Sequence, residues 1–342
     1  MKQPDGRSNK RLLYAGMLYD YGDPARGLSF EERNFCHPLK RYCEKSGWEM
    51  ARFDFMELGR RHGQERMSEM LWETVRRENP DYLVSVLFNP QHDPCGEVLQ
   101  RISAETGTVT LNWFCDDHWR FDSYSRFVAP NFNVAITTDS EAIPKYRAIG
   151  MGDRVVKSQW ACNQELYRPL PCSREIEVSF VGQPHGSRAE VAQSLWNRGI
   201  PLKVFGYGWR GAPRLPFNEM IRVFNRSRIN LNLSNASTDA RQQIKGRNFE
   251  IPGTRSFLLT GPADNLEEYY ADGKEVVVFR CPEEMIDRIR YFSRHESERD
   301  AIAEAGYQRT IKEHTWEHRW SEIFTRIQRW IGGRRSRAPS PF

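Results

Sequence analysis

The sequence predicts an α/β protein built from two doubly wound parallel sheets, and three observations support this fold class. Short apolar runs alternate with amphipathic, helix-length stretches along most of the chain. The chain has 342 residues, whereas a single hydrophobic core rarely grows past about 250–300 residues. A proline-punctuated stretch interrupts the alternation, which then resumes. The expected organisation is a first domain (1–166), a hinge (167–175), a second domain (176–315), a C-terminal helix (316–331) and a flexible basic tail (332–342).

The first half begins with a short buried strand at residues 11–16, which ends at Gly16. Ser29 and the two glutamates that follow Phe30 resemble a capping box, so a helix is expected to start there. The apolar run at residues 81–88 has the composition of a strand in a parallel sheet that is buried on both faces. The other expected elements are strands near 48–54, 108–114, 134–138 and 154–157 and a helix near 64–78.

The second half repeats this pattern after the hinge. A helix is expected to begin near Thr238, in a polar turn with several potential N-caps, and to run toward Glu250, with Pro252 and Gly253 ending it. Its free N-terminal amides would point at the carboxyl end of the preceding strand, where open α/β sheets bind ligands. An ordinary capped crossover helix is the alternative. The other expected elements are strands near 177–182, 202–206, 229–233, 257–260 and 275–279 and helices near 188–198, 218–225 and 283–330.

The final helix carries one apolar stripe at helical spacing, formed by Trp320, Ile323, Phe324, Ile327 and Trp330. Such a stripe is typical of a helix packed on a core. A basic amphipathic helix also suits peripheral contact with a membrane surface, which is the most membrane association that we expect.

Composition narrows the class of protein. The 50 basic and 45 acidic residues give a net charge of +5, too balanced to indicate nucleic acid as a partner. No run approaches 18 apolar residues and the N-terminus lacks the apolar segment of a signal peptide, so we expect a cytoplasmic protein. The seven cysteines show neither paired motifs nor metal-ligand spacing, which favours free thiols and predicts no bound metal or cofactor.

The most informative stretch reads K-G-R-N-F-E-I-P-G, directly before an apolar run. In it, Lys245 and Arg247 supply cations for phosphates, and Glu250 supplies a carboxylate that can accept hydrogen bonds from a ribose. Arg247 and Glu250 are three residues apart, so they can also simply pair with each other on one helix face. Ser237 and Thr238, in the polar turn before this stretch, are expected beside the same ligand.

Two glycine-containing turns are expected at the same edge of the second sheet. Gly182 opens a turn that leads into a helix, so the backbone can approach a ligand closely and Arg188 can reach a phosphate. This turn has neither the spacing of a nicotinamide fingerprint nor that of a P-loop. Tyr207 lies in the next turn between two glycines, where its ring either stacks on a base or caps the core.

In the first domain, Asp116, Asp117 and His118 come directly after an apolar strand. Two carboxylates and an imidazole at a strand end suit proton abstraction from an acceptor hydroxyl. The alternatives are an N-cap aspartate with a surface histidine, and a metal site for which no further ligand is evident. Gly16 and Asp20, after the first strand, are expected to face the same cleft.

Together these motifs resemble the signature of bacterial CgeB-like (spore-maturation) glycosyltransferases. The resemblance is most specific in the C-terminal half and extends over roughly residues 11–328. The matching motifs lie at 115–118, 137–139, 180–183, 245–253, 257–260, 274–277 and 314–319.

The resemblance implies a GT-B fold, in which two Rossmann-like domains face a central cleft and the C-terminal one binds a nucleotide-diphosphate sugar. It implies that Glu250 holds the donor ribose, and that Arg188 and Lys245 face the diphosphate. Many retaining members carry a second glutamate eight positions earlier, where this chain has Gln242, so the stereochemistry stays open. Arg255 also stands where relatives usually have a small residue, giving an extra positive charge or a salt bridge.

The resulting hypothesis is a metal-independent glycosyltransferase that moves a sugar from a nucleotide sugar to a hydroxyl of a glycan, lipid-linked or protein acceptor. In an inverting reaction, Asp116 or Asp117 is the expected base, whereas a retaining reaction needs no separate base. Three alternatives remain: a nucleotide-sugar epimerase or phosphorylase, a non-catalytic surface-associated protein, and a nucleic-acid-binding protein acting through the basic tail.

Overall fold

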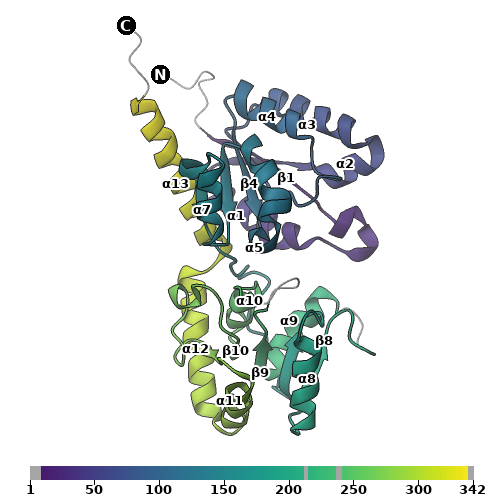
Figure 1. The fold of residues 1–342 in the computed structure, drawn as a ribbon, viewed down its shortest axis with the longest axis vertical. Coiled ribbons are helices and arrows are strands. Elements are labelled where there is room, and N and C mark those ends of the chain that lie inside the picture. The colour runs from purple at the N-terminus through teal and green to yellow at the C-terminus, as the bar shows by residue number, and fades with distance from the viewer. Residues whose placement is uncertain (1–8, 212–214, 236–240, 338–342) are drawn as a thin grey trace. The chain divides into compact units, whose positions relative to one another are not determined.

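The computed structural model describes residues 9–211, 215–235 and 241–337, with side chains described up to residue 332. Two compact units divide the chain, one ending at Gln159 and resuming at Trp316, the other spanning Trp160–Thr315. Each unit contains one parallel sheet flanked by helices (Figure 1). The predicted fold class of two doubly wound α/β sheets is therefore confirmed.

The first sheet has the strand order β2-β1-β3-β4-β5-β6, and all of its strands run parallel. All the strands expected in the first half form. Strand β3 ends at Ser85, earlier than expected, because the amide of Leu87 leaves the ladder and donates to the side chain of Asn112 at 2.9 Å. The strands are β1 (Arg11–Gly16), β2 (Glu49–Asp54), β3 (Tyr82–Ser85), β4 (Val109–Phe114), β5 (Val134–Thr137) and β6 (Val155–Lys157).

Helices cover both faces of this sheet. Alternate residues of the strands, such as Leu13 and Leu83, pack against α2, α3 and α4, whose apolar faces form one core with them. The expected helix start at Ser29 is present, because the Oγ of Ser29 accepts the amide of Glu32 at 2.9 Å. The helices of this unit are α1 (His37–Lys45), α2 (Phe55–His62), α3 (Gln64–Glu78), α4 (Gly96–Glu105), α5 (Asp117–Arg120), α6 (Arg126–Val128), α7 (Ala142–Ala148) and α13 (Trp316–Arg337).

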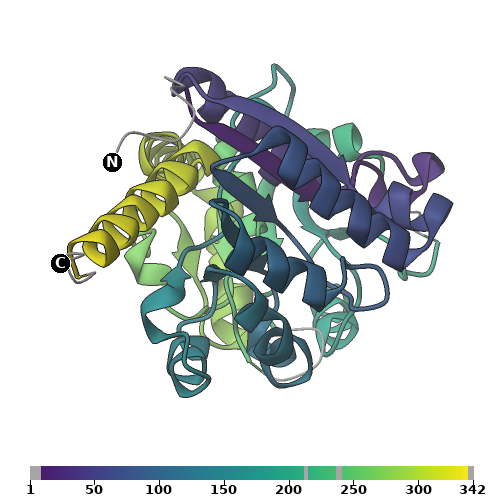
Figure 2. The same cartoon turned by 90° about the horizontal axis from the view of Figure 1, so that it is seen from above.

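The last helix, α13, belongs to the first unit, although it follows the second unit in the sequence. Its first tryptophan, Trp316, lies 4.4 Å from the ring of Phe35, measured between centroids, and α13 also packs along α1. Figure 2 shows this helix in yellow. Its apolar stripe is buried from Trp320 to Ile327, which confirms the predicted packing on a core. Among the described helices, none has the length and apolarity that crossing a bilayer requires.

The second sheet has the order β11-β10-β9-β7-β8, again entirely parallel. One face, with α8 and α11, forms a core around Val178 and Ile229, and the other packs on α9 and α10 around Leu258. The strands are β7 (Ile176–Val181), β8 (Leu202–Phe205), β9 (Ser227–Asn232), β10 (Leu258–Thr260) and β11 (Val277–Val278). The helices are α8 (Arg188–Asn197), α9 (Phe217–Arg226), α10 (Arg247–Gly253), α11 (Pro282–Arg294) and α12 (Glu296–Glu313).

The helix expected to run from Thr238 to Glu250 is much shorter than predicted. Thr238 lies outside the described residues, and α10 begins only at Arg247 and includes Pro252. Residues 241–246 are held in a loop instead, because the backbone of Gln242 pairs with that of Asn235 and the next amide donates to the carbonyl of Ser234 at 3.1 Å. The expectation that helix amides near Thr238 face a ligand therefore finds no support in the described loop.

The proline-punctuated segment at residues 167–175 lies within the second unit. Its backbone is tied to α9, because the side chain of Asn225 accepts the amide of Leu170 at 2.8 Å and donates to the carbonyl of Arg168 at 3.2 Å. Just before it, Cys162 forms a parallel bridge with Thr315, so the two ends of the unit lie side by side.

Candidate functional site

The candidate site lies at the carboxyl ends of β7 and β9, the two strands at which the winding of the second sheet changes direction. The chain leaves β7 toward β8 on one side, whereas β9, β10 and β11 follow on the other. Loops after such a pair of strands diverge and leave a crevice, which is where open α/β sheets bind ligands.

Arg188, the first residue of α8, joins the loops that follow these two strands. Its guanidinium donates to the carbonyls of Gln183, Leu233 and Asn235 at 3.0–3.2 Å and to the side chain of Asn235 at 3.1 Å. All four acceptors are uncharged, and no described carboxylate pairs with this arginine. The structure places Arg188 at the switch point of the sheet, and its predicted contact with a phosphate stays a prediction.

Glycines allow the first two loops of the site to touch. The indole of Trp209 donates to the carbonyl of Gly182 at 2.7 Å, and a Cβ on Gly206 would lie 2.6 Å from that same oxygen. Only a residue without a side chain fits so close an approach at a φ of +128°. Between them, Tyr207 projects from the turn with 70% of its surface exposed, while Trp209 packs against the core. Of the two aromatic residues, Tyr207 is therefore the one available to stack on a ligand.

Glu250 in α10 is buried and bound by two side chains. Its Oε1 accepts the hydroxyl of Tyr167 at 2.9 Å, and its Oε2 pairs with the guanidinium of Arg247. The pairing of Arg247 with Glu250, which the sequence left open, thus exists. A carboxylate oxygen has two lone pairs, so acceptor sites remain. The ribose contact that the family resemblance implies for Glu250 stays a prediction.

Positive side chains of the candidate site influence one another's pKa values. Burial, and secondly the positive charge of Arg247, lower the pKa of Arg188 to about 10. Burial alone would lower the pKa of Arg247, but Glu250 and Tyr167 outweigh it and raise that pKa. The pKa of His185 is lowered by burial and then by Arg188 and Lys245. Like charges therefore act on each other in three pairs, namely Arg188 with Arg247, His185 with Arg188 and His185 with Lys245. An anion among these side chains would relieve that repulsion.

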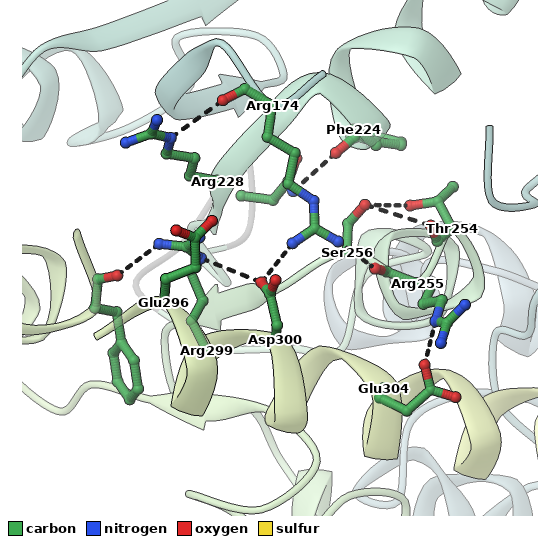
Figure 3. Close-up of polar contacts among 12 residues, drawn as sticks. Arg174, Phe224, Arg228, Thr254, Arg255, Ser256, Glu296, Arg299, Asp300 and Glu304 are labelled. Atoms are coloured by element: carbon green, nitrogen blue, oxygen red, sulfur yellow. Dashed lines mark hydrogen bonds and ion pairs between the residues drawn. The ribbon is translucent and has the colours of Figure 1, made fainter. Parts of the chain in front are cut away.

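The arginines at the other end of this unit differ from Arg188 because they are paired (Figure 3). Arg174 pairs with Asp300 and donates to the carbonyl of Arg255, which in turn pairs with Glu304. Figure 3 also shows Arg299 with its carboxylate partners. Arg255 therefore makes a salt bridge rather than adding free positive charge.

Ser237 and Thr238, two of the expected donor contacts, lie outside the described residues. Gln242, which stands where a second glutamate was expected, is exposed. Its backbone pairs with that of Asn235, whose side chain accepts from Arg188.

In the first unit, the three residues of the predicted cluster after β4, Asp116, Asp117 and His118, differ in how deeply they are buried. Asp117 is 1% exposed, and its Oδ2 accepts the hydroxyl of Tyr146 at 2.9 Å. Burial raises the pKa of Asp117 to about 6 against the opposing hydrogen bonds, which include the one from Tyr146. His118 is also buried, whereas Asp116 is partly exposed. This burial favours a structural role for Asp117 and leaves Asp116 nearer the surface.

The charges of Asp20 and Asp116 affect the pKa of Glu31, a residue that the sequence predicts only as part of a helix cap. Burial first, and then the charges of Asp20 and Asp116, raise the pKa of Glu31 to about 7. Asp20 also accepts a hydrogen bond from Arg26 at 3.1 Å. Nothing in the sequence spacing of these three residues indicates that they meet, because the β1–α1 connection and the end of β4 are joined only by the sheet.

Gly16, expected to face a cleft, is buried at the end of β1. A Cβ at this position would lie 2.4 Å from the ring of Tyr14. Any other residue at position 16 would clash with the ring of Tyr14, so the glycine is explained by packing. Among the described residues, no group of three or more His, Cys, Asp or Glu side chains is arranged to hold a metal ion.

Residues 188–325 match the sequence profile of the glycosyl transferase-like family. The matched segment begins at Arg188 and includes Lys245, Arg247 and Glu250, the charged residues of the candidate site. A search of curated protein sequences gives no significant match.

Solved structures of similar fold cover nearly the whole chain. Sucrose-phosphate synthase from Thermosynechococcus elongatus has a TM-score of 0.64 at 7% identity, covering 95% of this chain and 100% of that one. Anabaena HepE in complex with UDP and glucose has a TM-score of 0.63 at 10% identity, covering 94% and 100%. A glycosyltransferase from Rickettsia africae has a TM-score of 0.59 at 10% identity, covering 95% and 99%. At such identities the likeness shows the fold, which is that of GT-B glycosyltransferases.

Proposed function

We propose that this protein is a glycosyltransferase that uses a nucleoside-diphosphate sugar as donor and a hydroxyl of a glycan, lipid or protein as acceptor. The observation that carries the proposal is the meeting of Arg188 and Arg247 at the switch point of the second sheet, with no described carboxylate on Arg188. The family match over residues 188–325 supports the same function, as do the UDP complexes of the fold neighbour HepE. The CgeB-like subfamily remains the resemblance on which the finer proposal rests.

In this proposal, cations of the second unit stabilise the charge that develops on the leaving diphosphate. Arg188, Lys245 and Arg247 are arranged before the ligand arrives, so they need little reorganisation as the charge grows. Tyr207 is the proposed stacking partner of the base. In the first unit, Asp116 and Glu31 are the proposed proton acceptors for the acceptor hydroxyl, since the pKa of Glu31 lies near neutral pH.

The first test is binding of nucleotides to the wild-type protein. In a thermal-shift screen against UDP, GDP, dTDP and CMP, we expect at least one diphosphate to stabilise the fold, by roughly 2.7 kcal/mol at 100 times its dissociation constant. The matching nucleoside should bind much more weakly, and the affinity of the diphosphate should fall with added salt.

Lys245→Gln tests the site itself. We expect this variant to bind the diphosphate about tenfold more weakly, as for the loss of one charge-assisted contact, with little change for the nucleoside. Lys203→Gln is the control, because Lys203 is an exposed lysine on β8 of the same sheet. Equal binding by both variants would place the anion site elsewhere, and no stabilisation by any nucleotide would refute the proposed function.

A further inference from the structure

Three side chains of the second unit form a row that leads from the core to the candidate site. Tyr167 lies in the segment before β7, and its ring packs edge-on against Phe217 at a centroid distance of 5.7 Å. Its hydroxyl donates to one oxygen of Glu250 at 2.9 Å, and the other oxygen of Glu250 pairs with Arg247. The carboxylate therefore has one partner on its inner side and one on its outer side.

Burial along this row is graded. Tyr167 and Glu250 are each 1% exposed, whereas the side chain of Arg247 is 26% exposed. A residue at position 246 with a side chain would press on the carboxylate, because a Cβ there would lie 3.0 Å from Oε1 of Glu250. Of the three side chains, only Arg247 can meet a ligand without a rearrangement.

The donors of Arg247 are not all used. Its Nε is buried and has no hydrogen-bond partner among the described residues. A buried guanidinium N–H without a partner carries a desolvation cost, which an anionic ligand oxygen would remove. Burial first, and then the positive charge of Arg247, lower the pKa of Arg188. The fixed guanidinium thus stands at the edge of the proposed diphosphate site.

We propose that Tyr167 and Glu250 are positioning residues that hold the guanidinium of Arg247 in place to bind the donor diphosphate. The inference rests on the proposed function and deepens it, because it assigns Glu250 a role through Arg247 rather than through direct contact with the donor ribose. Holding a long arginine side chain in one rotamer before binding removes an entropic cost that the ligand would otherwise meet.

The test compares two variants that each remove one buried tyrosine hydroxyl. Tyr167→Phe breaks the bond to Glu250. Tyr270→Phe is the control, because the hydroxyl of Tyr270 lies in the same apolar core but bonds to that of Thr310 at 2.7 Å rather than to Glu250. Both variants should lose similar thermal stability, since each loses one buried hydrogen bond. The ligands are the nucleoside, the monophosphate and the diphosphate of the base that stabilises the wild type most.

We expect Tyr167→Phe to weaken the diphosphate roughly tenfold, the monophosphate less and the nucleoside hardly at all, with Tyr270→Phe unchanged for all three. In an Arg247→Gln background, Tyr167→Phe should cause no further loss, because a residue that acts only through Arg247 has nothing left to position. Tyr167→Phe should weaken binding of the 2′-deoxynucleoside diphosphate by the same factor as binding of the ribonucleoside diphosphate.

Three results would overturn the inference while leaving nucleotide binding by the wild type intact. One is an unchanged affinity in Tyr167→Phe. Another is that Tyr167→Phe weakens diphosphate binding as much in the Arg247→Gln background as it does in the wild type. The third is a loss confined to the ribonucleotide, which would assign the carboxylate to the ribose instead. If the wild type binds no nucleotide at all, the proposed function fails and the inference fails with it.

Discussion

The two sheets of this protein are wound in the same order but carry opposite charge at corresponding edges. In each sheet the first strand is next to the edge, with the second strand on one side of it and all the later strands on the other. After the first strand of the first sheet come Asp20 and Glu31, whereas after the first strand of the second sheet come His185 and Arg188.

This difference teaches that topology supplies a place for a ligand and that side chains decide which ligand it suits. At the edge of the first sheet, burial raises the pKa values of carboxyl groups toward neutral pH, as acid–base chemistry requires. At the edge of the second sheet, Arg188 has only uncharged partners, and the one carboxylate that pairs with Arg247 also accepts from Tyr167, which suits an anionic ligand. The predictions below challenge this division, beginning with the largest expected effect.

Glu250→Ala should abolish donor binding and turnover, because it removes the carboxylate that holds the guanidinium of Arg247 in place. Titration calorimetry and a transfer assay would measure this. The control is Glu304→Ala, which removes the exposed carboxylate paired with Arg255 in the same unit. Turnover like that of the wild type in Glu250→Ala would contradict the site assignment.

Glu31→Gln and Asp116→Asn should lower turnover by roughly 10²–10⁴-fold if these carboxylates accept the acceptor proton, with nucleotide binding unchanged. The base must be ionised, so the wild-type rate should rise with pH through about 7, the pKa of Glu31, and Glu31→Gln should lose that limb. If the same variants also bound the nucleotide more weakly, the assignment of proton transfer to the first sheet and of nucleotide binding to the second would be wrong. Retained turnover in both variants would favour a retaining reaction without a separate base.

Asp117→Asn should change stability rather than activity. Burial raises the pKa of Asp117 from its ordinary value of 3.8 to about 6, so the folded protein binds more protons than the unfolded chain between these values. The stability of the wild type should therefore fall as pH rises through this window, and the variant should gain roughly 2 kcal/mol relative to it from pH 4 to 7. Tm values across this range would show it, with Asp122→Asn, an exposed neighbour, as control. A large loss of activity without the pH effect would restore Asp117 as a candidate base.

Arg255→Gly should have the smallest effect. Arg255 has a φ of +57°, a conformation that costs a residue with a side chain roughly 1–2 kcal/mol, while its exposed pair with Glu304 contributes at most about 1 kcal/mol. A slight gain in Tm with unchanged nucleotide affinity is expected, since the arginines at that end of the unit are structural. If Arg255→Gly bound the diphosphate more weakly than the wild type, the anion site would have to include Arg255.

The sequence was sufficient to predict both sheets, because parallel strands are marked by continuous apolar runs between helix-length stretches. It also singled out Arg188 and the stretch at 245–253, since both follow strands that had been identified. It did not predict that residues 241–246 form a loop, because pairing between Gln242 and Asn235 outweighs local helix propensity. Tyr167 was missed because its contact with Glu250 joins residues 83 positions apart. Glu31 was missed for the same reason, since only the folded sheet brings it to Asp116.

The parallel bridge between Cys162 and Thr315 brings the two ends of the second unit together, so the unit can be exchanged as one piece. Its two ends emerge beside each other, and the amide of Cys162 donates to the carbonyl of His314 at 2.9 Å. An exchange of the second unit with that of a relative should therefore cut at these two points and leave α13 behind. An exchange of everything after residue 175 would also replace α13, and with it the tryptophans that pack in the core of the first unit.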